Sequence, residues 1–162
     1  MAAVTVDGVD GLRELVGQRI GPSEWLEVTQ ERIDMFAEVS GDHQWIHVDP
    51  ERAGRESPYK STIAHGNLTL SLIDGFRGKL IDQQGVVMGI NYGWNKVRFP
   101  APVPVGSRVR ASAEVLSVEE LDGGWWHIVT KFVVEPEGGE KPACVAESVI
   151  RLLAGEPDAA PG

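Results

Sequence analysis

Two residues whose side chains can activate a water molecule, a carboxylic acid and an imidazole, lie five positions apart in one short segment. They are Asp42 and His47, with Gly41 before them and Pro50 after them. Five residues span at most about 17 Å when extended, and a loop that begins at glycine can curl so that both side chains point into one pocket. There Asp42 can accept a proton from water while His47 holds that water or supplies a proton elsewhere. Such a pair needs neither a covalent nucleophile nor a metal ion.

A second segment supplies candidate donors for a negatively charged oxygen. Residues 64–67, Ala-His-Gly-Asn, lead directly into an apolar stretch that we expect to be helical. The first backbone N–H groups of a helix have no partner inside the helix, and the helix dipole favours negative charge beside them. Gly66 would let a ligand carbonyl approach such an N–H group closely. We therefore take Gly66, His65 and Asn67 as candidate oxyanion- and substrate-binding residues.

A longer pattern surrounds these two segments. It comprises residues 40–53 (Ser-Gly-Asp-His-Gln-Trp-Ile-His-Val-Asp-Pro-Glu-Arg-Ala), residues 64–66, residues 97–99 (Val-Arg-Phe), Pro102-Val103 and Gly106. Together these motifs resemble the MaoC-like (R)-specific enoyl-CoA hydratases (hydratase 2), and particularly the single-domain actinobacterial members. The resemblance extends over roughly residues 20–153, and its first motif is long and specific.

The resemblance implies a fold, a reaction and an assembly. The family has the hot-dog fold, in which a curved antiparallel sheet wraps a long central helix. The matching Asp42 and His47 imply activation of water for addition to a trans-2-enoyl thioester, and the matching Gly66 N–H implies the oxyanion donor. The implied reaction is reversible hydration of trans-2-enoyl-CoA to (R)-3-hydroxyacyl-CoA by a homodimer without a cofactor. Gln44-Trp45 replaces the usual Asn-Pro, and Asp74 stands near the place where some members use a serine, so Asp74 receives no role.

Other polar residues of the first segment have ordinary structural interpretations. Asp49 precedes a proline and a glutamate, which is typical of a helix N-cap followed by its first turn. We interpret His43 as a solvated neighbour of the pair. The spacing of the carboxylate and imidazole groups matches neither HExxH nor a cysteine–histidine pattern, so we expect no metal site.

The same chemistry and fold leave three alternative functions open. The first is an acyl-carrier-protein-dependent 3-hydroxyacyl dehydratase of fatty-acid synthesis. The second is a non-catalytic acyl-thioester binding module, against which the complete Asp42–His47 pair argues. The third is a hot-dog thioesterase, a class that usually lacks this motif.

Composition limits the classes of partner. The chain has 162 residues, of which 42% are hydrophobic and 24% charged, as is ordinary for one globular domain. The net charge of −9 argues against a nucleic-acid or anionic-membrane partner. Basic residues nevertheless gather at Lys96, Arg98, Arg108 and Arg110, so the mean charge need not describe the mouth of a pocket for CoA. One cysteine, Cys144, and the absence of a secretion signal or a long apolar run lead us to expect a cytoplasmic protein.

The apolar pattern predicts an α+β protein with one domain over residues 1–154 and a frayed tail over 155–162. Apolar residues almost all round the first half of 67–81 predict a buried helix. Alternating residues separated by turns at 122–124 and 136–141 predict an antiparallel meander, and pairing across a two-fold axis would cover an exposed edge. The other expected elements are helices at 9–16, 29–39 and 50–54, an irregular lid at 55–63, and strands at 24–28, 85–99, 108–118, 125–135 and 142–153.

Overall fold

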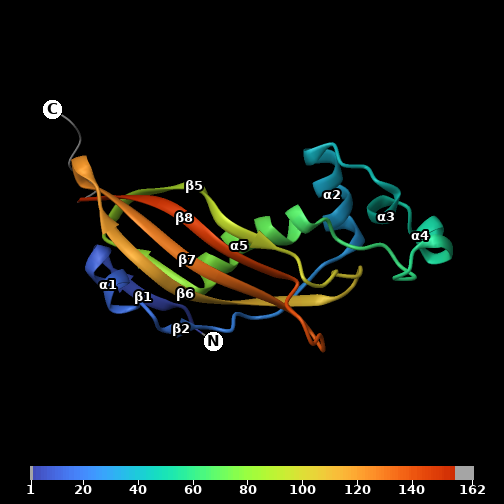
Figure 1. The fold of residues 1–162 in the computed structure, drawn as a ribbon, viewed down its shortest axis with the longest axis horizontal. Coiled ribbons are helices and arrows are strands. Elements are labelled where there is room, and N and C mark those ends of the chain that lie inside the picture. The colour runs from blue at the N-terminus through green and yellow to red at the C-terminus, as the bar shows by residue number, and fades with distance from the viewer. Residues whose placement is uncertain (1, 156–162) are drawn as a thin grey trace.

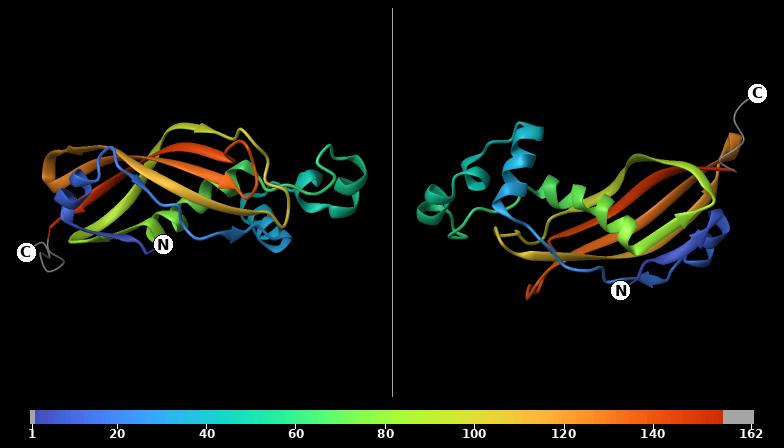
Figure 2. Two further views of the ribbon diagram at one scale, coloured as in Figure 1. Left: turned by 90° about the horizontal axis from the view of Figure 1, so that it is seen from below. Right: turned by 180° about the vertical axis from the view of Figure 1, so that it is seen from behind.

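A long helix lies inside the curve of an antiparallel sheet in this protein (Figure 1). The computed structural model describes residues 2–155, so the expected tail lies, apart from Gly155, outside the described residues. The sheet has six strands in the order β2-β6-β7-β8-β5, with β3 also paired to β6. Helix α5 (Gly66–Leu80) crosses its concave face (Figure 2), and this is the expected hot-dog arrangement. The strands are β2 (Arg19–Ile20), β3 (Leu26–Glu27), β5 (Val86–Arg98), β6 (Arg108–Glu120), β7 (Trp125–Pro136) and β8 (Cys144–Ala154).

One face of α5 anchors it in the sheet. Ile73 and Phe76 are 0% and 1% exposed, and Leu68 and Leu80 are also buried. Burying each such side chain contributes about 1.5–3 kcal/mol to the free energy of folding. The helix faces the inner side of β6, whose alternating residues are buried as predicted. These inward residues of β6 are Val109, Ala111, Ala113 and Val115.

The predicted meander is confirmed. A short turn at Asp122–Gly124 joins β6 to β7, and Gly123 and Gly124 there adopt φ values of 72° and 78°, which favour glycine. Strand β8 then pairs antiparallel with both β7 and β5. Cys144 is fully buried in β8, and this burial raises the pKa of its thiol to about 11, as suits a core residue rather than a nucleophile.

The N-terminal segment differs from the sequence expectation. Strand β1 (Val4–Asp7) pairs in parallel with β4 (Ile81–Gln84), which continues directly from α5. Each strand has only four residues, Val-Thr-Val-Asp and Ile-Asp-Gln-Gln, and a local pattern does not reveal which distant strand it pairs with. Helix α1 spans Gly8–Glu14 and is therefore shorter at its C-terminal end than the predicted 9–16.

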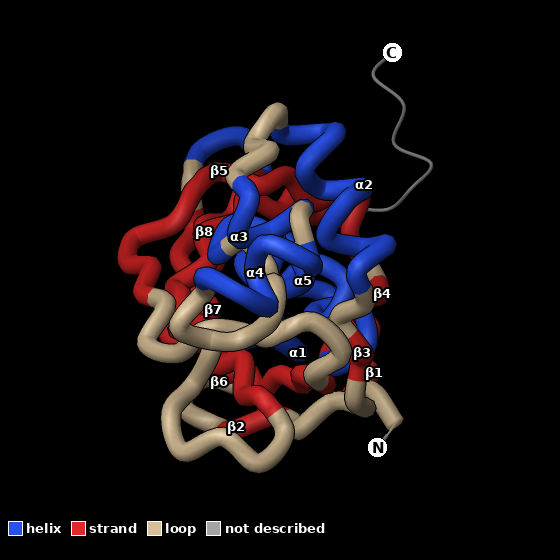
Figure 3. The backbone as a smooth tube through the Cα atoms, turned by 90° about the vertical axis from the view of Figure 1, so that its right-hand side faces the viewer, coloured by secondary structure: helices blue, strands red, loops and turns tan. Residues whose placement is uncertain are grey.

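Three helices gather at one end of the sheet, beside the start of α5 (Figure 3). They are α2 (Gln30–Ser40), α3 (Trp45–Val48) and α4 (Pro50–Glu56). Because α4 continues to Glu56, the predicted irregular segment begins only at residue 57. Ser57 and Thr62 in this segment are each 1% exposed, whereas residues 58–60 between them are exposed, so the segment is anchored at these two positions. Among the described residues, no helix is both long and apolar enough to cross a bilayer.

Candidate functional site

The end of α2 delivers Asp42 to the site. Thr29 caps the start of this helix by accepting a hydrogen bond from the Arg32 N–H at 3.3 Å, as predicted. At the other end Gly41 has φ 77° and donates to the Ala37 carbonyl at 2.8 Å. A left-handed residue at this position ends a helix and turns the chain sharply, and glycine adopts that conformation without strain.

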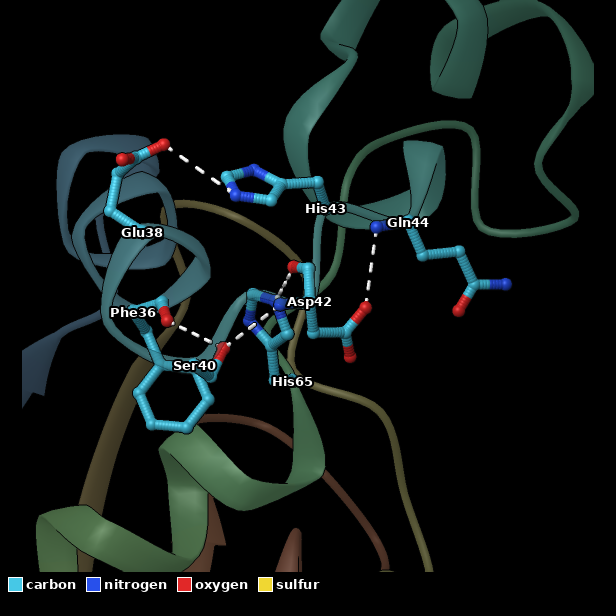
Figure 4. Close-up of polar contacts among 7 residues, drawn as sticks. All are labelled: Phe36, Glu38, Ser40, Asp42, His43, Gln44 and His65. Atoms are coloured by element: carbon cyan, nitrogen blue, oxygen red, sulfur yellow. Dashed lines mark hydrogen bonds and ion pairs between the residues drawn. The ribbon is translucent and has the colours of Figure 1, made fainter.

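Asp42 is exposed, and its loop is fixed by local hydrogen bonds (Figure 4). Its N–H donates to Ser40 Oγ, and its Oδ1 accepts from the Gln44 N–H, each at 3.3 Å. Among the described residues, Oδ2 has no hydrogen-bond partner, so this oxygen is available to a water molecule. The neighbouring His43 points away and lies 3.6 Å from Glu38, in agreement with the predicted solvated position.

His47 projects from α3 into the interior, where it is 6% exposed. Its Nδ1 lies 2.7 Å from the Ile63 carbonyl, which can only accept, so Nδ1 carries the proton and Nε2 presents a lone pair. Gln30 donates to the His47 carbonyl at 2.7 Å and accepts from Thr62 Oγ1 at 2.5 Å. Sequence reasoning missed Gln30 and Thr62, because nothing in their local sequence distinguishes them from other polar residues.

The surroundings of His47 keep its imidazole neutral. Burial lowers its pKa most, and the nearby His65 lowers it further. The hydrogen bond to the Ile63 carbonyl and the Asp42 carboxylate act in the opposite direction, but the pKa remains below its ordinary value of 6.5. At neutral pH, Nε2 of His47 is therefore a hydrogen-bond acceptor and a potential base.

His65 lies against both members of the pair. Its ring stacks on the His47 ring with centroids 3.8 Å apart and an angle of 24°, and Phe36 packs against it at 5.0 Å. Its Nε2 lies 2.9 Å from the Asp42 carbonyl (Figure 4). The structure thus brings Asp42, His47 and His65 together, and their potential ligand atoms lie within 4.8 Å of one another.

This spacing suits a shared water molecule. Two acceptors that each hold one proton of a water molecule at about 2.8 Å lie about 4.5 Å apart. The stacked rings of His47 and His65 keep their lone pairs in nearly parallel planes. Tetrahedral metal ligands instead converge on one point at about 2.0–2.1 Å. A separation of up to 4.8 Å therefore admits a shared water molecule, and the same three residues could also hold a metal ion.

The start of α5 provides the candidate oxyanion donors. Its first backbone hydrogen bond runs from Thr69 N–H to the His65 carbonyl at 3.2 Å, and the His65 side chain does not cap the helix. The N–H groups of Gly66 and Asn67 have no backbone acceptor among the described residues. A cavity of about 320 Å³ opens beside Gly66. Its lining comprises Tyr59, Ile63, Ala64, Gly66, Thr69, Phe99, Pro100, Ala101, Pro102, Val103 and Ala143.

Glycine at position 66 is required by a neighbour that the sequence did not reveal. A Cβ atom there would lie 2.9 Å from two atoms of the Phe99 ring. We expect Gly66→Ala to displace that ring or the start of α5, and to lower, about tenfold or more, kcat/KM of the hydration reaction that the sequence resemblance implies. Gly54→Ala is the matched control, because a Cβ atom at that helical glycine meets nothing within 4 Å. Equal rates for the two variants would contradict a tight fit at Gly66.

The expected basic cluster is largely neutralised. Arg108 pairs with Glu137, Arg110 with Glu135 at 2.5 Å, and Lys96 with Glu147 at 3.5 Å. Arg98 is exposed and forms no ion pair with an acidic residue of the described chain. Asp49 caps α4 by accepting from the Arg52 N–H at 2.9 Å, which confirms its structural interpretation.

Comparisons with known proteins agree with this fold. Residues 12–134 match the model of the MaoC like domain. The 3-hydroxyacyl-thioester dehydratase Z of Mycobacterium tuberculosis strain H37Rv is 50% identical over 150 residues, which cover 93% of this chain and 99% of that protein. Among solved structures, R-hydratase PhaJ1 from Pseudomonas aeruginosa has a TM-score of 0.65 and 28% identity, covering 90% of this chain and 85% of that one. The (R)-hydratase of A. caviae, involved in PHA biosynthesis, has the same score and identity, covering 83% and 94%.

The matched region includes both α2 and α5, and so contains every residue of the Asp42, His47 and His65 cluster. The matching domain model covers more than half of the chain, and the mycobacterial dehydratase matches nearly all of it. The chain therefore belongs to the MaoC-like dehydratase family.

Proposed function

We propose that this protein catalyses the reversible hydration of trans-2-enoyl-CoA to (R)-3-hydroxyacyl-CoA. The observation that carries the proposal is the juxtaposition of two groups that can accept a proton, the Asp42 carboxylate and the His47 imidazole, whose potential ligand atoms lie within 4.8 Å of each other. The start of α5, where the Gly66 and Asn67 N–H groups have no backbone acceptor among the described residues, lies one residue beyond the stacked His65. The names of the relatives support the reaction class and the R configuration, because they describe a 3-hydroxyacyl-thioester dehydratase and two R-hydratases.

Each group has one part in the proposed reaction. Water donates one hydrogen bond to Asp42 and one to Nε2 of His47, which directs an oxygen lone pair at C3 of the substrate. The bond from oxygen to C3 forms as Asp42 takes a proton, and the π electrons of the C2–C3 double bond move towards the thioester oxygen. The Gly66 N–H and the dipole of α5 stabilise the resulting enolate oxygen.

The tautomer of His47 decides which group completes the reaction. Its Nδ1 proton is held by the Ile63 carbonyl, and its Nε2 carries no proton. Protonated Asp42 therefore returns a proton to C2, after which both groups are as they began. Dehydration follows the same steps in reverse, so no cofactor is required.

The test is the loss of enoyl-thioester absorbance when the protein is added to crotonyl-CoA, followed by a series of longer enoyl-CoA substrates. Chiral analysis of the product is expected to give the R isomer. The same enoyl groups on acyl carrier protein provide the comparison for a dehydratase of fatty-acid synthesis. If kcat/KM is higher for the carrier-protein substrates, the proposed substrate is an acyl-carrier-protein thioester rather than a CoA thioester. Binding without turnover would indicate a non-catalytic module.

We also propose that the protein works as a homodimer. Strand β5 lies at one edge of the sheet, and Ile90 and Tyr92 on it are 47% and 63% exposed. An exposed edge with apolar side chains pairs readily with another strand, and pairing between two copies would cover it. Light scattering should give twice the monomer mass, and a monomer mass at every concentration would contradict the proposal.

A further inference from the structure

His65 touches both members of the proposed pair through different parts of its side chain. Its Nε2 reaches the Asp42 carbonyl at 2.9 Å, and its ring faces that of His47 with centroids 3.8 Å apart. The side chain is 3% exposed and is backed by Phe36, so it has little freedom to move. It comes from the start of α5, whereas Asp42 and His47 come from the segment after α2. His65 therefore connects the two halves of the site.

The hydrogen bonds of His65 also determine its tautomer. The Asp42 carbonyl can only accept, so Nε2 of His65 carries the proton, and in the neutral ring Nδ1 is a lone pair. That Nδ1 is buried and has no hydrogen-bond partner among the described residues. A buried polar atom without a partner is destabilising, and an apolar ring would avoid that cost. Stability alone therefore does not explain a histidine here.

We propose that His65 is a positioning residue for both members of the pair: its hydrogen bond holds the loop that carries Asp42, and its ring holds the imidazole of His47 in place. This inference rests on the proposed function, because the two side chains need a fixed separation only if they share one water molecule. A misplacement of about 1 Å in such a pair can cost about 100-fold in rate.

The charges around His47 provide a measurement that tests this role, namely the pKa of His47. Replacing a residue that only fills space would not change this pKa. Burial lowers the pKa of His47, His65 lowers it further, and Asp42 raises it. Two other charged residues nearby interact elsewhere: Asp34 of α2 accepts a hydrogen bond from Gln30, and the guanidinium of Arg52 of α4 lies over the Trp45 ring. Replacing His65 by a residue that cannot take up a proton removes the electrostatic influence by which His65 lowers the pKa of His47, so that pKa moves up. Because Nε2 must be unprotonated, the acid limb of kcat/KM then moves to higher pH.

Two variants separate the hydrogen bond from the ring. His65→Phe keeps an aromatic ring but loses the bond to the Asp42 carbonyl, and we expect kcat to fall about 10- to 100-fold while KM stays within about threefold. His65→Gln can place an amide N–H near the position of Nε2, so its loss should be smaller than that of the phenylalanine variant. In both variants the acid limb of the kcat/KM profile should move to higher pH. The titration of the His47 ring, followed by NMR, should move in the same direction.

His43→Gln is the matched control, because His43 is exposed, adjoins Asp42 in sequence and pairs only with Glu38 among the described residues. It should change neither kcat nor the titration of His47. Wild-type kcat in a folded His65→Phe variant, or an unmoved His47 titration in both His65 variants, would overturn the inference. If the phenylalanine variant does not fold, the glutamine variant decides it by the same two measurements. A wild-type protein that hydrates no enoyl thioester would refute the proposed function, while the NMR titration would still test the contact between the rings.

Discussion

Asp42→Asn is expected to lower kcat for hydration of crotonyl-CoA by about 10³-fold, which corresponds to about 4 kcal/mol of transition-state stabilisation. An amide has nearly the same shape as the carboxylate, and its oxygen can still accept from the Gln44 N–H, as Oδ1 of Asp42 does at 3.3 Å. The variant should therefore fold normally and lose only the ability to take a proton from water. Initial rates from the loss of enoyl absorbance measure the effect.

Asp49→Asn is the control for this substitution. Asp49 lies in the same segment but caps α4, and asparagine is as good an N-cap as aspartate. Thermal melting should show that both variants are as stable as the wild type to within about 1 kcal/mol. Wild-type rates in Asp42→Asn would show that another group accepts the proton, and the proposed mechanism would be wrong.

Removing the acceptor of His47 should have an effect of similar size, about 10² to 10³-fold in kcat. Two replacements divide its functions. His47→Asn can still donate to the Ile63 carbonyl from the position of Nδ1 but places no atom at Nε2. His47→Gln reaches the position of Nε2 but leaves the Ile63 carbonyl without its donor. Loss in the asparagine variant would therefore assign the effect to Nε2 rather than to packing.

The pH profile and the double variant complete this prediction. Because the pKa of His47 lies below 6.5, kcat/KM should hold as pH falls to that value and decline only below it, when Nε2 becomes protonated. Combining Asp42→Asn with His47→Asn should cost little more than the worse single change, since two groups that hold one water act as a unit. Strictly multiplicative losses, or an acid limb well above 6.5, would refute a shared water molecule.

The features that could be predicted from sequence depend on neighbouring residues. Gly41 ends a helix because of its own conformational freedom, and Thr29 and Asp49 begin helices because their side chains reach an N–H three residues on. The alternation in β6 likewise follows from the two faces of a strand. Such signals place Asp42 and His47 in one short segment, although the structure forms the short helix α3 around His47 where the sequence predicts a loop, and the motif around them indicates the family.

The remaining features depend on contacts between distant segments, which no local pattern specifies. His65 meets the Asp42 carbonyl across 23 residues, and Thr62 meets Gln30 across 32. The contact that requires glycine at position 66 comes from Phe99, which directly follows β5 and is distant in sequence from the start of α5. The charges of the expected basic cluster are largely neutralised by contacts of the same kind, because the acidic partners lie on other strands or the turns between them, such as Glu137 for Arg108.

Phe99 follows the last residue of β5 directly, and its ring occupies the space where a side chain at position 66 would begin. The residue that follows the outermost long strand therefore lies close to the first residue of the central helix. Any partner that shifts this strand would also move the aromatic ring against that first residue. If association of two copies holds this strand in its active position, specific activity should fall on dilution. Turnover per protomer would then depend on the concentration of the protein.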